Sequence, residues 1–211
     1  LGGNVPIENT TRNALQAVEE CGREVPVYAG CEKPLMRELV TADNVHGMDG
    51  MGDCGLIHPT RKPEKLHAVE FILETVKKYP DEVEIVSLGP ASNIALAIMK
   101  DRATMNRVKH IWSMSTSGFG AGNITPVAEF NVFVDAESYS VMLNSGIPMT
   151  IAGFDLCLGD AAFTPDELEE MSVTPLGRFI AEGNRVKLGF NEKLNGVPFV
   201  DLPDAVNVPP V

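Results

Sequence analysis

Apolar residues recur along this chain with a helical period in some segments and form short β-branched runs in others. The helical period is clearest at 63–79, where lysines and glutamates lie on or near the face opposite Leu66, Val69, Leu73 and Val76. Pro80 ends that segment. Thr164, followed by a proline and acidic residues, predicts the start of another helix. Similar patterns predict helices at 7–21, 94–99 and 135–144.

Short strands are predicted between these helices. Apolar and β-branched residues concentrate in four runs, at 25–28, 84–88, 110–114 and 148–152. We expect the run at 84–88 to be a buried strand. Because runs and helices alternate, the fold class should be α/β, with a mostly parallel sheet and crossover helices. In such sheets ligands bind beyond the carboxyl ends of the strands, so the loops there should hold the functional residues.

Composition narrows the class of partner. The 211 residues are 44% hydrophobic, enough to bury a sizeable core, and we expect a single domain. A formal net charge of −12 argues against nucleic-acid and anionic-membrane partners, because phosphate surfaces repel such a field. No apolar run approaches the ~20 residues of a membrane span. Buried reduced thiols, which favour a reducing compartment, are expected at Cys21, Cys31, Cys54 and Cys157.

The segment 122–135 carries the most specific chemistry. It reads Gly-Asn-Ile-Thr-Pro-Val-Ala-Glu-Phe-Asn-Val-Phe-Val-Asp and gathers Asn123, Glu129 and Asn131 between two predicted buried elements. Amides and a carboxylate can hydrogen-bond the hydroxyls of a sugar in a fixed orientation. The same residue types also suit a polar turn that caps neighbouring elements. Both interpretations are open on composition alone.

Seven segments, in order along the chain, resemble the calcium-dependent inosine-uridine nucleoside hydrolases. The segment 122–135 is similar to the family's ribose-binding segment. Two others are His-Gly-Met-Asp-Gly-Met-Gly-Asp at 46–53 and Leu-Pro-Asp-Ala-Val at 202–206. The remaining four lie at 3–14, 25–34, 88–97 and 148–155. The resemblance covers nearly the whole chain and implies a Rossmann-like nucleoside hydrolase core.

The resemblance also implies segments that this chain does not contain. The family opens with a strand and a loop of the form Asp-x-Asp-x-Gly-x-Asp-Asp, which supplies most calcium ligands and the general base. No such cluster occurs between Leu1 and Val211, and the family continues beyond the last segment. We therefore expect 1–211 to be one nucleoside hydrolase domain that is incomplete at both ends, with its catalytic aspartate elsewhere.

Site residues follow from the resemblance position by position. Asn123, Glu129 and Asn131 would hold the ribose hydroxyls, with Phe130 turned into the core. Asn4 would bind the attacking water or the ribose, although a turn or helix cap would suit it nearly as well. His46 would lie on the nucleobase side. The Leu88 backbone carbonyl and Asp204 would bind calcium. Asp201 is a nearby competitor of Asp204, and a solvated loop carboxylate is the alternative for both.

Other residues are set aside. Trp112 could stack on a base, but its apolar run predicts a packed core aromatic. Asp49 and Asp53 lack the further ligands of a calcium loop. His67 should lie on a helix surface and His110 at a strand start, and the four histidines have no zinc-site spacing.

Two departures from the family concern the pocket. The family has Gly-Gly after the residue at Met114, whereas Ser115, Thr116 and Ser117 follow here, so the pocket should be narrower or more polar. Pro203 replaces a histidine that protonates the leaving base in some members, so the preferred base stays open.

The implied reaction is hydrolysis of the N-glycosidic bond of ribonucleosides, giving ribose and free base. A Ca²⁺ cofactor, a homo-oligomer and a cytoplasmic location come with this expectation. The 211 residues alone should bind calcium poorly and turn over little or nothing. A noncatalytic nucleoside- or ribose-binding protein and an unstable truncated fragment are the alternatives.

Overall fold

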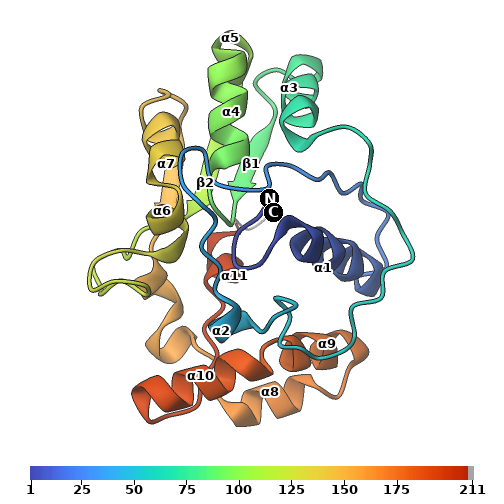
Figure 1. The fold of residues 1–211 in the computed structure, drawn as a ribbon, viewed down its shortest axis with the longest axis vertical. Helices are drawn as coiled ribbons and strands as arrows, with labels where there is room; N and C mark the ends of the chain where they lie inside the picture. The colour runs from blue at the N-terminus through green and yellow to red at the C-terminus, as the bar shows by residue number, and fades with distance from the viewer. Residues whose placement is uncertain (209–211) are drawn as a thin grey trace.

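Three parallel strands form the sheet of this protein, whose residues 1–208 are described by a computed structural model (Figure 1). The strands are β1 (Glu84–Ser87), β2 (His110–Met114) and β3 (Met149–Ala152), in the order β1-β2-β3. Their register pairs Ile85 with Ile111 and Ile111 with Met149. The predicted α/β class with a parallel sheet is therefore confirmed. Residues 209–211, which the expected domain includes, lie outside the described part.

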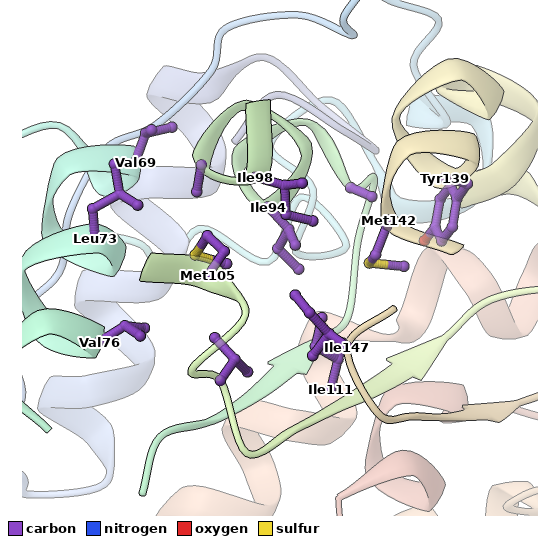
Figure 2. Packing of buried hydrophobic residues seen from close by; sticks show 13 residues of the cluster. Val69, Leu73, Val76, Ile94, Ile98, Met105, Ile111, Tyr139, Met142 and Ile147 are labelled. Carbon is purple, nitrogen blue, oxygen red and sulfur yellow. The ribbon is translucent and has the colours of Figure 1, made fainter. Parts of the chain in front are cut away.

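Helices cover one face of the sheet. They are α3 (Ala68–Lys78), α4 (Ser92–Lys100), α5 (Arg102–Met105) and α7 (Ala136–Leu143). Their apolar side chains pack together over Ile111, as Figure 2 shows. Leu73, Ile98 and Met142 are among the buried members of this core. Burial of these side chains is what fixes the helices against β2, since each contributes roughly 1.5–3 kcal/mol.

The opposite face of the sheet is open. Val86, with 41% of its surface exposed, and the partly exposed Trp112 lie side by side on it. Trp112 is tilted against the His110 ring and donates its indole N–H to Glu84. The expectation of a buried strand at 84–88 is therefore wrong for this face, as is that of Trp112 as a packed core aromatic. Both predictions require a covering layer over this face, and the helices of the structure do not extend over these residues.

Two element predictions differ from the structure for local reasons. Residues 25–28 form no strand, because Tyr28 makes only an isolated bridge to Glu64. The helix expected from Pro63 begins at Ala68, since Glu64 forms that bridge, 65–66 is a bend, and the His67 ring accepts the Val69 N–H as a cap. His67 is thus a capping residue. The other predicted helices and strands are found within one or two residues of their expected bounds.

A second group of helices lies beyond the carboxyl ends of the strands. In Figure 1 the helices α8 (Pro165–Met171), α9 (Pro175–Gly183) and α10 (Arg185–Asn195) sit at the end of the molecule opposite α5. Thr164 caps α8, as predicted, and the structure adds a full capping box with Glu167. The short helices α2 (Asp43–His46) and α11 (Pro203–Asn207) lie between this group and the sheet, and two 3₁₀ turns, η1 (Phe154–Cys157) and η2 (Gly159–Ala161), follow β3.

Helix α1 (Ile7–Glu20) is held by hydrogen bonds to a long irregular segment rather than by a strand. Asn9 and Asn13 donate to the carbonyls of Met48 and Asp49, and Arg12 donates to Ile57. The polar face of α1 is thereby bound to residues 48–61. Asp49 and Asp53 hydrogen-bond within their own turn, as expected of loop residues.

Side-chain environment corrects one further expectation. Cys157 is buried, Cys31 and Cys54 are partly buried, and Cys21 is exposed; all four are free thiols. Buried thiols were expected at all four positions, so the prediction is wrong for the exposed Cys21. None of the helices within 1–208 combines the length and the apolar character required to cross a membrane.

Candidate functional site

Glu129 is the most unusual carboxylate at the carboxyl end of the sheet. It stands immediately before α6 (Phe130–Val134), and its two oxygens accept the N–H groups of Asn131 and Val132 at 3.0 and 3.2 Å. Only 3% of its surface is exposed. Burial raises its pKa to about 7, and the charge of Asp204 adds to the effect. A strongly perturbed carboxyl group at a strand-end loop is typical of functional sites.

The two asparagines of the same segment lie differently. Asn131 is buried and directs its amide toward the end of β2, with Nδ2 3.4 Å from the Met114 carbonyl oxygen. Asn123 is exposed, and its Oδ1 accepts the Phe130 N–H at 2.8 Å. Asn123 and Glu129 therefore both cap the start of α6, the alternative left open by the sequence. Phe130 packs into a small cluster with Ala42 and Val134, as expected.

Asp204 approaches this segment from the opposite end of the chain. Helix α11 contacts β2, β3 and η1, so Asp204 reaches the carboxyl edge of the sheet. Its side chain keeps exposed surface although dense protein surrounds its carboxyl group, which raises its pKa to about 6.

Asn4 and Leu88 lie in neighbouring loops. Leu88 follows β1 directly, and the next residues, Gly89 and Pro90, contact the segment of Asn4: an added side chain on Gly3 would sit 3.4 Å from Pro90. The backbone of Asn4 accepts the Ala42 N–H. The structure thus brings Asn4 next to the end of β1.

His46 ends α2 on the other side of the site. Burial lowers its pKa to about 4, and the charge of Lys187 acts in the same direction. The ring is therefore neutral at pH 7, so it can accept or donate one hydrogen bond without carrying charge. Its neighbours Lys187 and Asp201 show that it lies closer to α10 than to Glu129.

The described residues do not form a complete cation site. Within 1–208, no three His, Cys, Asp or Glu side chains come together in a group that could hold a metal ion. Glu129, the carboxylate near Asp204, accepts one backbone N–H on each oxygen and keeps one acceptor site per oxygen for a ligand hydroxyl. A hard cation needs six to eight oxygens. One carboxylate and one backbone carbonyl do not suffice.

Several buried polar groups escaped the sequence analysis. Lys187 pairs with Asp201, and Asn191 donates to the same carboxylate. Tyr139 donates its hydroxyl to the Gly89 carbonyl next to the buried Ser113. An i, i+4 pair of polar residues on α10 was the only available signal for the first group.

Comparison with known proteins decides the family. The family model described as inosine-uridine preferring nucleoside hydrolase matches residues 1–208. The chain belongs to this family. It is 37% identical over 172 residues to the pyrimidine-specific ribonucleoside hydrolase RihB of Escherichia coli, a match that covers 81% of this chain. It is 44% identical over 158 residues, 74% of the chain, to the uncharacterized protein C1683.06c of Schizosaccharomyces pombe.

Solved structures agree with the family on fold. The plant nucleoside hydrolase PpNRh1 superposes with a TM-score of 0.88 at 28% identity over 98% of this chain. A purine-preferring ribonucleoside hydrolase from Gardnerella vaginalis superposes with a TM-score of 0.86 at 29% identity over 97%. The nucleoside hydrolase fold is therefore confirmed.

The chain spans about half the length of the curated relatives it matches. It covers 54% of RihB and 51% of the S. pombe protein, and 66% and 68% of the two solved structures. The comparisons thus establish the family and the fold of this chain.

Proposed function

We propose that this chain is the sugar-binding part of a ribonucleoside hydrolase, which cleaves the N-glycosidic bond to give ribose and free base. One observation carries the proposal. Glu129, buried beside the inward-facing Asn131, lies close enough to Asp204 for their charges to interact, although 75 positions along the chain separate them. Family membership supplies the reaction class, and RihB is a curated relative with a stated activity.

The chemistry of each group follows from its environment. Asn131 can donate to a sugar hydroxyl from a buried position, where a hydrogen bond is stronger than in water. Glu129 remains an acceptor above its pKa of about 7 and can bind two adjacent hydroxyls of a ribose. Asn4, next to the end of β1, and Asn123 complete the proposed sugar contacts. His46, neutral and half-buried, is proposed for the nucleobase side.

Calcium dependence belongs to the proposal for the whole protein. In that proposal Ca²⁺ would orient the sugar hydroxyls and acidify a water molecule. The Leu88 carbonyl and Asp204 are the ligands that this chain could offer. Because they do not form a complete site, we assign no step of the reaction to the ion here. A single nucleoside hydrolase domain, a homo-oligomer and a cytoplasmic location are further parts of the proposal.

The preferred base is left open by the relatives themselves. RihB is named for pyrimidines and the Gardnerella enzyme for purines. Pro203 has no transferable proton, so a leaving base must be activated by another group or by its own electronics.

The proposal is tested on the protein encoded by the complete reading frame, obtained by sequencing upstream and downstream of the codons for this chain. Ribose release from inosine and uridine is measured in calcium and in chelator. We expect calcium-dependent release, with kcat/KM reduced at least about 100-fold by Glu129→Gln, because several kcal/mol of positioning depend on that carboxylate. Glu137→Gln, on an exposed face of α7, should change it less than about twofold. Unchanged activity in Glu129→Gln would contradict the proposal.

A noncatalytic binding protein is the second candidate, favoured by the incomplete cation site among residues 1–208. Saturable inosine or ribose binding in chelator, without turnover of the full-frame protein in calcium, would establish it.

A further inference from the structure

Helix α10 presents three polar side chains, the buried Lys187 and Asn191 and the exposed Arg185, to two different segments. Lys187 and Asn191, one turn apart, face the chain just before α11, whereas Arg185 faces the loop just after α2. Those two segments carry Asp204 and His46, the residues proposed for opposite sides of the ligand. Figure 1 shows α2 and α11 on the same side of α10.

The contacts to the Asp204 segment are dense. Lys187 Nζ donates to both the backbone oxygen and the carboxylate of Asp201, at 2.6 and 2.7 Å. Asn191 Nδ2 donates to Asp201 Oδ1 and to the Phe199 carbonyl, both at 3.0 Å. Lys187 and Asp201 are only 7% and 3% exposed. Val200 is held from the other side by two backbone hydrogen bonds to Phe163.

This arrangement separates the two neighbouring aspartates by role. The Asp201 carboxylate binds Lys187 and Asn191 inside the protein. Asp204, three residues later, is free of that pair and keeps exposed surface. The segment is fixed at Asp201 and offers Asp204 to the site.

The contacts to the His46 loop are equally direct. The Arg185 guanidinium donates to the carbonyls of Gly52 and Asp53, at 2.9 and 2.8 Å. The Gly52 N–H in turn donates to the His46 carbonyl at 2.8 Å. Gly52 adopts a left-handed φ of 69° against the end of α9, where an added side-chain carbon would lie 2.6 Å from the Glu182 oxygen. Only glycine fits such a close approach.

We propose that α10 is a brace that sets the spacing between the Asp204 segment and the His46 loop, with Lys187, Asn191 and Arg185 as positioning residues. The brace itself follows from contacts within this chain; its consequence for a ligand rests on the proposed function. A buried ion pair is a costly way to gain stability, because desolvation offsets the attraction. Here the Lys187–Asp201 pair is joined by Asn191 and by the backbone oxygen of Asp201. This set of contacts favours one arrangement of the chain over others.

Amide hydrogen exchange on the purified 211-residue chain tests the brace without ligand or turnover. Four amides report: Val200 and Ala205 for the Asp204 segment, Gly52 for the His46 loop, and Ile111, bonded to Pro148 in the sheet, for the core. Lys187→Met should accelerate exchange at Val200 and Ala205 at least about tenfold, since a lost hydrogen bond to a charged group exceeds 1.4 kcal/mol. Gly52 and Ile111 should change less than about twofold.

Matched variants sharpen the outcome. Arg185→Met should accelerate Gly52 and leave Val200 unchanged, and Lys193→Met, an exposed lysine on the same helix, should change no reporter. If Lys187→Met does not fold, Asn191→Leu removes two other contacts to the same segment without leaving a charge unpaired and should give a smaller rise at Val200. Equal acceleration at all reporters, or none at Val200 in either variant, would overturn the brace. Neither result depends on whether the protein hydrolyses nucleosides.

Discussion

Glu129 is subject to two opposing effects. Its oxygens accept two N–H groups at the start of α6, which favours the charged form, yet its burial favours the neutral form. Burial is the stronger of the two, and the pKa rises from 4.5 to about 7. A capping acid without this burial, such as the exposed Glu167 in the capping box of α8, has its pKa lowered instead. The difference separates a structural cap from a candidate ligand group.

The stability of the protein should therefore depend on pH through Glu129. A folded-state pKa above the unfolded value means that the folded chain binds the proton more tightly, so the free energy of unfolding falls as pH rises from about 4.5 to about 7. The loss amounts to about 3 kcal/mol at most, from 1.36 kcal/mol per pKa unit. Urea unfolding at several pH values should show this decline in the wild type and a flatter profile in Glu129→Gln.

The control for that experiment is Glu137→Gln. Glu137 is paired with Arg37 on an exposed surface, which lowers its pKa, so its removal should leave the decline between pH 4.5 and 7 in place. A Glu129→Gln profile as steep as the wild type would show that Glu129 titrates normally.

At the scale of elements, the end of β2 has an unusual backbone. The resemblance to the family predicts Gly-Gly after Met114, and Ser115 and Thr116 stand there in this sequence. Ser115 is fully buried, and Thr116 adopts a φ of 71°, a left-handed conformation that costs a β-branched residue roughly 1–2 kcal/mol. The Thr116 hydroxyl offsets part of that cost by accepting the Gly118 N–H.

Thr116→Asn should therefore stabilise the protein by about 0.5–1 kcal/mol, because asparagine tolerates this conformation and its side chain can accept the same N–H. The change is measured by urea unfolding at one pH. Thr75→Asn, within α3, should instead be neutral or cost a few tenths of a kcal/mol. A loss of stability in Thr116→Asn would mean that the threonine methyl group contributes packing that outweighs the backbone cost.

The elements that sequence predicted well are those whose signal is local. The strand His110–Met114 follows from a β-branched and aromatic run, and α8 follows from its capping box, since both patterns involve neighbours in the chain. Residues 25–28 have the composition of a strand but no partner beyond Tyr28–Glu64, and pairing is not encoded locally. The Lys187–Asp201 pair joins a helix to a loop 14 residues on, and the i, i+4 spacing of Lys187 and Asn191 does not indicate that partner.

At the scale of the whole molecule, described helices cover one face of the sheet and leave part of the other face uncovered. Parallel sheets are normally covered on both faces, whereas Val86 and Trp112 lie on an open one. The relatives are about one and a half times as long as this chain. Site residues from the family could be assigned by position, because seven segments match in order, but their capping contacts and the brace of α10 required the structure.

We propose that these 211 residues contain the sugar-binding side of a nucleoside hydrolase site but not its general base. The most direct measurement is ribose release from inosine and uridine by the purified 211-residue chain, in calcium and in chelator. We expect none above the blank in either condition. Calcium-stimulated release would contradict the claim, and it would make Glu129, with its pKa of about 7, the first group to examine as the base within this chain.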